Sequence, residues 1–391
     1  MKKRFETRAI RLQNKQTGER EHSVPIFPTS SFTFENAEQM RSVFASEQPG
    51  NIYSRFTNPN CRELETKIAS LEETEDAVAL ASGMSAVFGA LMGHLQAGDH
   101  LLCARAVFGS TYQVLMNWLP RWGIETTFVD GMNVESWEKA IQKNTKMFFL
   151  ETPSNPGLAI IDLELVGIFC KTQEILMVVD NCFATPYLQQ PMNFGAHLVT
   201  HSATKFIDGQ GRVVGGLVAG TSEYLAPVQR FLRNTGPALS PFNAWILSKS
   251  LETLAVRMDR HCSNAMVLAE WAESLEMIKN IRYPFLPSHP GSAVAKKQMS
   301  QGGGLLTFEM RGGLAAGKQF LDNLQICSLS ANLGDTRTIV THPASTTHNK
   351  LSPEDRQKVG ITDGLIRVSV GLEHMDDIKA DLLQSLKKIT S

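Results

Sequence analysis

The sequence of 391 residues has almost no excess of charge of either sign, and it contains no long hydrophobic run. Its 38 basic and 39 acidic side chains give a formal net charge of -1, so no basic field exists to hold nucleic acid or an anionic membrane. No segment approaches the ~18 uninterrupted apolar residues of a membrane helix. The basic start of the chain is not followed by an apolar run and does not read as a secretory signal. These absences favour a soluble, cytoplasmic protein.

Cysteine is also scarce, and its spacing excludes a metal site of the usual kind. The chain has no Cys-x-x-Cys pair and no cluster of cysteine and histidine at metal-binding spacing. We therefore expect no metal, and we expect the thiols to be reduced and to fill small apolar spaces. The six cysteines are Cys61, Cys103, Cys170, Cys182, Cys262 and Cys327. Internal repeats and low-complexity tracts are absent as well, which argues against a scaffold protein.

The first part of the chain, residues 1–60, shows no helical or strand periodicity. Four prolines exclude any long helix there: Pro25, Pro28, Pro49 and Pro59. So many unperiodic residues are uncommon unless they cover another surface, so we predict an extended arm. The pattern changes at residue 62. An amphipathic helix is expected from there to residue 73, with Leu64, Ile68 and Leu71 on one face.

Short apolar runs then alternate with helical stretches, which predicts an α/β fold. Continuous apolar runs are typical of parallel strands with helices on both faces, so a mostly parallel sheet is expected. The expected strands lie at residues 76–81, 100–104, 125–130, 146–151, 174–180, 196–202 and 215–220. The predicted domains are the arm (1–60), a large α/β domain (61–245) and a smaller α+β domain (246–391).

Two of the expected strands end in residues that can do chemistry. One ends on Asp180, and the next leads into Ser202, Thr204 and Lys205. Ligands of open α/β sheets bind at the carboxyl ends of strands. A buried carboxylate there would keep a pyridine nitrogen protonated, and a nearby lysine would condense with an aldehyde. Because strand-end aspartates are often caps and lysines are usually solvated, the residues alone leave these roles open.

A phosphate site is the second candidate feature of the large domain. Gly83 and Met84 stand between an expected strand and the start of a helix. Backbone N–H groups at such a helix start can approach a phosphate, since the glycine removes a side chain from the path. The hydroxyls of Ser202 and Thr204 could donate to the same group. The alternative is a glycine that serves packing alone.

Three motifs together resemble the cystathionine γ-synthase/methionine γ-lyase family of pyridoxal 5'-phosphate (PLP) enzymes. They are YSRFTNP (53–59), VVDNCFATP (178–186) and SATKF (202–206), and the resemblance extends over essentially the whole chain. It implies PLP as cofactor, the type I fold of PLP-dependent transferases, Lys205 as the Schiff-base lysine and Asp180 as the partner of the pyridinium nitrogen. It also implies the residues of the phosphate site, which are Gly83, Met84, Ser202 and Thr204.

The resemblance gives the unperiodic arm a role. It implies that Tyr53 and Arg55 reach the phosphate of the neighbouring subunit, in a homotetramer built as a dimer of dimers. It further implies that Arg367 grips the α-carboxylate of the substrate, which suits a bidentate guanidinium, with Asn155 beside it. Cys182 takes a position that is commonly threonine in the family, and we interpret it as a packing residue.

Two departures from the family pattern bear on the reaction. Many relatives stack a tyrosine over the cofactor ring, and here Phe108 stands in its place. Stacking survives, but a phenolic acid/base does not, which argues against the γ-lyases that rely on it. The family's Ser-Leu-Gly segment becomes Asn332-Leu333-Gly334, and Asn332 is a predicted substrate-binding residue.

The resemblance is strongest to the sulfhydrylase branch of the family. It implies γ-replacement, in which O-succinylhomoserine and hydrogen sulfide give homocysteine and succinate for methionine biosynthesis. The alternatives are O-acetylhomoserine as substrate, cysteine as nucleophile (a cystathionine γ-synthase) and γ-elimination. A dehydrogenase is disfavoured because the glycine-rich run at 209–216 does not follow a strand. Candidate cations for the succinyl carboxylate are Arg41, Arg105 and Arg337.

Overall fold

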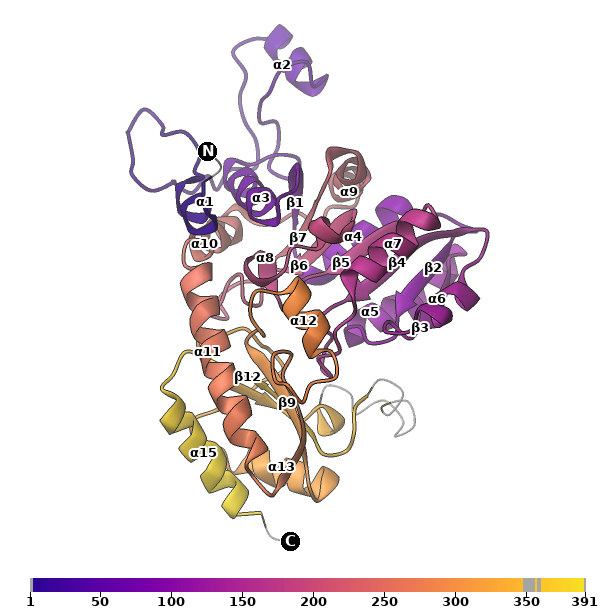
Figure 1. The fold of residues 1–391 in the computed structure, drawn as a ribbon. Helices are drawn as coiled ribbons and strands as arrows, with labels where there is room; N and C mark the ends of the chain where they lie inside the picture. Colours follow the sequence, from indigo (N-terminus) through magenta and orange to yellow (C-terminus); the bar gives the residue numbers. More distant parts are fainter. Residues whose placement is uncertain (1–2, 347–355, 357–359, 390–391) are drawn as a thin grey trace.

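Two β-sheets organise the chain (Figure 1), in a computed structural model that describes residues 3–346, 356 and 360–389. The larger sheet has seven strands in the order β1-β7-β6-β5-β4-β2-β3. Pairing is parallel from β6 across to β3, whereas β7 runs antiparallel to β1 and β6. The strands are β1 (Asp76–Leu80), β2 (His100–Ala104), β3 (Glu125–Val129), β4 (Thr145–Glu151), β5 (Leu176–Asp180), β6 (Leu198–Ser202) and β7 (Gly216–Gly220). The predicted α/β fold with a mostly parallel sheet is confirmed.

Helices cover both faces of this sheet, which explains why its strands are continuous apolar runs. In β1, Val78 and Leu80 pack on the side of α4 and α9, while Ala77 and Ala79 pack on the side of α3 and α10. The helical segments of this region are α3 (Pro59–Glu72), α4 (Gly83–His94), α5 (Gly109–Gln113), η1 (Val114–Trp118), η2 (Leu119–Trp122), α6 (Val134–Ala140), α7 (Leu163–Thr172), α8 (Thr185–Leu188), η3 (Pro191–Phe194), α9 (Ser222–Thr235) and α10 (Pro241–Leu251).

The first long helix, α3, begins three residues earlier than its apolar periodicity indicates. The side chain of Asn58 accepts a hydrogen bond from the N–H of Asn60, and Pro59 occupies the first turn, where its missing N–H costs nothing. The face predicted to be apolar is buried: Leu64, Ile68 and Leu71 are each 0% exposed.

The arm that precedes α3 contains two short helices, α1 (Phe5–Arg11) and α2 (Ala37–Phe44), where the sequence predicted irregular chain. α2 projects from the body of the molecule, and two extended segments of chain connect it to that body (Figure 1). Its amino end is capped by Asn36, whose side chain accepts from the N–H of Gln39. An isolated helix of eight residues is only marginally stable. The exposure of α2 therefore suits a segment that packs against another surface.

The smaller sheet has five strands in the order β10-β11-β12-β9-β8. The strands of this sheet and the helices around it are α11 (Leu254–Glu273), β8 (Ile278–Arg282), α12 (Ser292–Gln298), β9 (Leu305–Met310), α13 (Gly313–Asp322), β10 (Ser328–Leu329), β11 (Ile339–Thr341), η4 (Pro343–Ser345), β12 (Leu365–Ser369) and α15 (Met375–Lys387). All strands of the larger sheet precede residue 245, and all strands of the smaller sheet follow it. This supports the division into domains that we propose. Some residues of 1–60 and of 246–391 lie outside the described part of the chain. Within the described parts of the chain, no helix is both long and apolar enough to cross a membrane.

Candidate active site

A cavity of about 240 Å³ lies at the carboxyl edge of the larger sheet, where β4, β5 and β6 end. Parallel strands bring their carboxyl ends to one edge, so residues far apart in sequence meet there. The smaller domain closes the cavity with residues that include Arg367 of β12. The lining residues are Ser82, Gly83, Met84, Val87, Phe108, Thr111, Glu151, Asn155, Asp180, Cys182, Phe183, Ser202, Thr204, Lys205, Val214, Ala331, Leu333 and Arg367.

A cradle for an anion lies at the amino end of α4. Ser82 caps the helix by accepting a hydrogen bond from the N–H of Ser85, so the first turn of a twelve-residue helix faces the cavity. A Cβ on Gly83 would lie 2.5 Å from the Cβ of Ser202, so only glycine fits between helix and strand. Thr204 accepts a hydrogen bond from the N–H of Gly215 at 3.2 Å. The four residues predicted for the phosphate site all line the same cavity.

Lys205 follows β6 and points into the cavity. Its Nζ donates a hydrogen bond to Oδ1 of Asn332 at 2.7 Å. Burial lowers the pKa of this lysine, and the positive charge of Arg367 lowers it further, while Cys182 acts in the opposite sense. A lowered amine pKa leaves more of the side chain neutral, as a nucleophile or a base must be.

Asp180 ends β5 one strand away from Lys205. Burial raises the pKa of its carboxyl to about 6, although the N–H of Cys182 donates to its Oδ1 at 3.0 Å and favours the charged form. Burial and the charge of Asp180 raise the pKa of the Cys182 thiol. A thiol that keeps its proton is a poor nucleophile, which supports the interpretation of Cys182 as a packing residue.

Arg367 is 5% exposed and lines the cavity from the smaller domain. Its Nη1 donates to Oδ1 of Asn155 at 3.0 Å and its Nη2 donates to the carbonyl oxygen of Asn332 at 3.1 Å. Burial lowers the pKa of this guanidinium to about 10, and the charge of Glu151 opposes the shift. Asn332 thus joins the two cationic residues, through its side chain to Lys205 and through its backbone to Arg367.

Glu151 is a lining residue that the sequence analysis missed. It ends β4 and is the register partner of Asp180 at the end of β5. The available signal was the parallel between the two runs, because KMFFLE (146–151) ends on an acid just as EILMVVD (174–180) does. Burial raises the pKa of the Glu151 carboxyl well above its ordinary value, and the charge of Asp180 adds to the shift.

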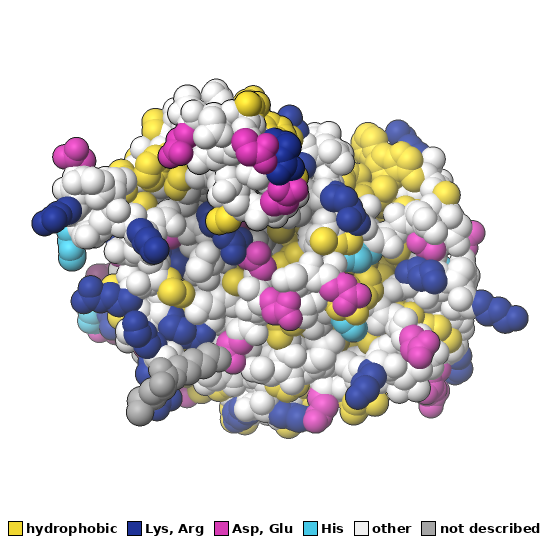
Figure 2. All heavy atoms as spheres, turned by 90° about the horizontal axis from the view of Figure 1, so that it is seen from above, with side chains coloured by type: hydrophobic (Ala, Val, Ile, Leu, Met, Phe, Trp, Pro, Cys, Tyr) yellow, Lys and Arg dark blue, Asp and Glu magenta, His cyan; other side chains and the backbone are white. Residues whose placement is uncertain are grey.

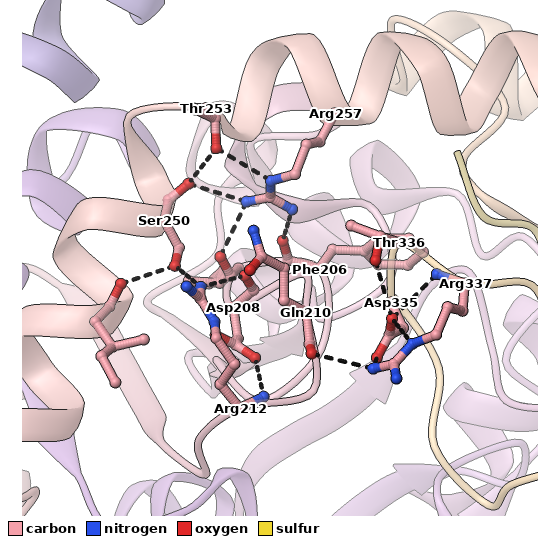
Figure 3. A network of polar contacts seen from close by, with 12 residues as sticks. Phe206, Asp208, Gln210, Arg212, Ser250, Thr253, Arg257, Asp335, Thr336 and Arg337 are labelled. Carbon is pink, nitrogen blue, oxygen red and sulfur yellow. Dashed lines mark hydrogen bonds and ion pairs between the residues drawn. The ribbon is translucent and has the colours of Figure 1, made fainter. Parts of the chain in front are cut away.

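The loop that follows Lys205 is tied down by charged side chains (Figure 3). Arg257 of α11 donates to the carbonyl oxygens of Phe206 at 2.6 Å and Ile207 at 3.1 Å. Gly209 has a φ of +72°, and a Cβ there would lie 2.0 Å from Nη1 of Arg257. Arg337 donates to the carbonyl oxygen of Gln210 at 3.3 Å from the other side (Figure 3). Both arginines belong to residues 246–391, so side chains of the smaller domain hold the loop that follows Lys205.

The three arginines considered for a distal carboxylate lie outside the cavity lining. Arg41 on α2 pairs with Glu38 at 2.8 Å and with Glu47 at 2.7 Å. Arg337 pairs with Asp335 at 2.9 Å. The exposed Arg105 donates to the carbonyl oxygen of Phe128 at 3.4 Å.

Tyr53 and Arg55 are also absent from the cavity of their own chain. Tyr53 is 42% exposed. The guanidinium of Arg55 lies 4.8 Å from the centroid of the Phe56 ring and donates to the carbonyl oxygen of Arg233. The structure therefore brings together the predicted residues of the large and small domains, whereas Tyr53 and Arg55 of the arm lie outside the cavity lining.

Comparison with known proteins agrees with this geometry. Residues 6–387 match the family model described as Cys/Met metabolism PLP-dependent enzyme. The chain is therefore a member of that family, and its cofactor is PLP. The cradle at α4, the half-buried amine of Lys205 and the half-buried carboxyl of Asp180 fit the phosphate, the aldehyde and the ring nitrogen of that cofactor.

The similar proteins include both a sulfhydrylase and a γ-lyase. The chain is 47% identical to an O-succinylhomoserine sulfhydrylase of Pseudomonas aeruginosa, over 98% of this chain and 95% of that protein. It is 46% identical to an L-methionine γ-lyase of Fusobacterium nucleatum subsp. polymorphum, over 94% of each. A crystal structure named as an O-acetylhomoserine (thiol)-lyase from Campylobacter jejuni, which contains N'-pyridoxyl-lysine-5'-monophosphate, matches with a TM-score of 0.94 at 34% identity over 98% of this chain and 100% of that chain.

Proposed function

We propose that the protein catalyses γ-replacement on O-succinylhomoserine. The Cγ–O bond to succinate breaks, a Cγ–S bond to hydrosulfide forms, and the products are homocysteine and succinate. The family membership and the similarity to an O-succinylhomoserine sulfhydrylase support the proposal. The observation that carries it is the aromatic residue at the cavity, because Phe108 can stack on a ring but cannot exchange a proton.

Each residue of the cavity has a proposed task. Bound PLP supplies an electron sink for negative charge at the substrate Cα. Lys205 links to the cofactor and, once released, moves protons at Cα and Cβ, a use favoured by its lowered pKa. Asp180 holds the proton on the ring nitrogen. Arg367 binds the α-carboxylate, with Asn155 and Asn332 fixing the guanidinium plane.

A γ-lyase is the second candidate, favoured by the similarity to methionine γ-lyases at almost the same identity. The two reactions share the steps up to loss of the γ-substituent, so the same residues serve both. They differ in whether a thiol then adds at Cγ. Among the described residues that this chain contributes to its own cavity, Phe108 takes the place of the stacking tyrosine, which favours replacement over an elimination that depends on a phenol at that place.

A substrate panel on the PLP-loaded protein separates these candidates. O-Succinylhomoserine and O-acetylhomoserine are each offered with sulfide and with cysteine, and methionine is offered alone. We expect homocysteine from the succinyl ester and sulfide, with far less from the acetyl ester. Cystathionine as the main product would assign the synthase reaction, and methanethiol from methionine would assign the lyase reaction.

The arm supports a proposal about assembly. Tyr53 and Arg55 lie outside their own cavity, and α2 projects from the body (Figure 1). The view down onto the arm shows hydrophobic side chains at the surface beside it (Figure 2). The exposed hydrophobic residues include Met40, Phe44, Met116, Trp118 and Trp122. Uncovered apolar surface of this kind marks a contact with another protein, and we propose a homotetramer in which the arm completes the partner's phosphate site.

Mixing two inactive variants tests that exchange of residues between subunits. Arg55→Ala damages the partner's site, and Lys205→Ala damages its own, so a mixed dimer keeps one intact site. After unfolding and joint refolding, about a quarter of the wild-type activity should return if subunits pair at random. The control mixes Lys205→Ala with Asp180→Asn, which both act within their own cavity and should not complement. No recovery in the first mixture would show that each site is built from one chain.

A further inference from the structure

One face of α11 presents three buried polar side chains that have no task in the proposed reaction. Arg257, His261 and Asn264 follow one another at intervals of four and three positions, which places them on the same side of the helix. They are 6%, 0% and 4% exposed. Buried polar groups of this kind need hydrogen-bond partners. All three find them on backbone carbonyl oxygens of two segments that lie far apart in the sequence.

The first segment directly follows Lys205. Nη1 of Arg257 donates to the carbonyl oxygen of Phe206 at 2.6 Å, and Nη2 donates to that of Ile207 at 3.1 Å (Figure 3). The ring of His261 packs edge-on against the ring of Phe206, with centroids 5.2 Å apart and planes at 76°. The face of α11 therefore fixes both the backbone and the side chain that come next after the lysine.

The second segment directly follows β12, the strand that carries Arg367. Nδ1 of His261 donates to the carbonyl oxygen of Val370 at 2.7 Å. Nδ2 of Asn264 donates to the carbonyl oxygen of Gly371 at 2.9 Å. These two carbonyls belong to the first two residues after the strand. The same face of α11 therefore holds the end of β12 and the start of the loop after the lysine.

A further contact joins the two segments directly. The N–H of Gly334 donates to Oγ of Ser369, the last residue of β12, at 2.8 Å. Gly334 has a φ of +73°, and a Cβ there would lie 2.6 Å from the backbone nitrogen of Phe206. The backbone at Gly334 thus lies against both segments. Because Asn332 is only two positions away, this contact also places the side chain to which Lys205 donates.

We propose that Arg257 is a positioning residue that sets the distance between Lys205 and Arg367. The substrate must meet both of these residues at once, because in the proposed site its carboxylate binds Arg367 while its amino group and Cα lie at Lys205. One carbon joins these groups in an α-amino acid, so the molecule cannot adapt to a wrong distance. A misplacement of about 1 Å can cost about 10²-fold in rate. The inference rests on the roles proposed for Lys205 and Arg367, and it does not depend on the leaving group.

Three small probes distinguish this role from a merely structural one. α-Aminobutyrate has both the carboxylate and the amino group, butyrate lacks the amino group, and propylamine lacks the carboxylate. If Arg257 sets the distance, its replacement should weaken binding of the probe that spans both residues and spare the two that reach one residue each. A general loosening of the fold would affect the three probes alike.

The affinities are measured on the PLP-loaded protein. Binding of α-aminobutyrate and of propylamine is followed by the absorbance of the cofactor, and binding of butyrate by its competition with α-aminobutyrate. Arg257→Gln loses the fork that reaches two successive carbonyls. We expect its Kd for α-aminobutyrate to rise about tenfold, equivalent to about 1.4 kcal/mol of misfit, with little change for the other two probes.

Asp381→Asn is the matched control for lost stability. Asp381 of α15 is buried in the smaller domain but does not line the cavity. Its carboxylate accepts hydrogen bonds from three successive N–H groups, those of Gln325, Ile326 and Cys327. An amide cannot accept all three, so this variant should unfold at a lower temperature. Its affinities for the three probes should nevertheless equal those of the wild type.

The proposal is overturned if Arg257→Gln binds α-aminobutyrate as the wild type does, or if butyrate or propylamine is weakened as much as α-aminobutyrate. Should Arg257→Gln fail to fold, Asn264→Ala decides by the same two criteria, because it loosens the segment after β12 instead. None of the probes has a γ-substituent to lose. Failure here would therefore leave the γ-replacement proposal to be judged by the substrate panel on the wild type.

Discussion

Lys205→Ala should abolish turnover and remove the covalent link to the cofactor while the fold persists. The amine is the group at the cavity placed to condense with an aldehyde, and burial lowers its pKa toward the range of a working nucleophile. Removing it deletes both the attachment point and the proposed base. We expect the loss in kcat to reach the background rate, because residues that act as one unit cannot replace each other.

The measurement is reduction of the PLP-loaded protein with borohydride, followed by peptide mass analysis. In the wild type, the pyridoxyl group should be found on the peptide that contains Lys205. The variant should carry no such label and should keep its circular dichroism spectrum. Lys146→Ala, an exposed lysine on β4 of the same sheet, is the control and should retain label and activity. A pyridoxyl label on a different lysine of the wild type would contradict the assignment.

The larger sheet could be predicted from the sequence because burial on both faces leaves a simple mark. Residues of β1 such as Val78 and Ala79 face opposite sides of the sheet, yet both are covered by helices, so the strand is an unbroken apolar run. Helix boundaries were harder to predict. α3 begins at Pro59, where the cap by Asn58 decides the start and the apolar periodicity does not.

Residues at strand ends were predictable for a geometric reason as well. Asp180, Ser202 and Lys205 meet because parallel strands present their carboxyl ends at one edge. The position of the smaller domain against the larger one cannot be predicted from strand order in this way. The hydrogen bond from Lys205 to Asn332 joins residues that are 127 positions apart in sequence. It depends on how the two domains pack, which the periodicity of the sequence does not encode.

The arm shows a different limit of sequence reasoning. Its lack of periodicity predicted a segment that covers something, and α2 does project from the body (Figure 1). Nothing in the local pattern predicted the two short helices, because α1 and α2 are short and few of their residues are buried. Segments that pack against a partner follow the partner's surface more than their own periodicity.

Asp180→Asn should preserve the fold and reduce kcat by about 10²–10³-fold, the range for loss of one preorganised polar contact at a reacting centre. An amide cannot hold a proton on the ring nitrogen by charge, and an unprotonated ring is a poor electron sink. Cofactor affinity should fall as well, measured by the return of activity as PLP is added to the stripped protein. Asp130→Asn, an exposed aspartate just after β3, is the control.

The pH profile distinguishes this role from a structural one. The working form of Asp180 is the carboxylate, so activity should fall as pH decreases through its pKa. Burial raises that pKa to about 6 in the protein alone, and a cationic ring nitrogen against the carboxyl would lower it. The acid limb of kcat in the holoenzyme should therefore lie below pH 6, and it should disappear from the residual activity of Asp180→Asn. An unchanged acid limb in the variant would assign that titration to another group and leave Asp180 without its proposed role.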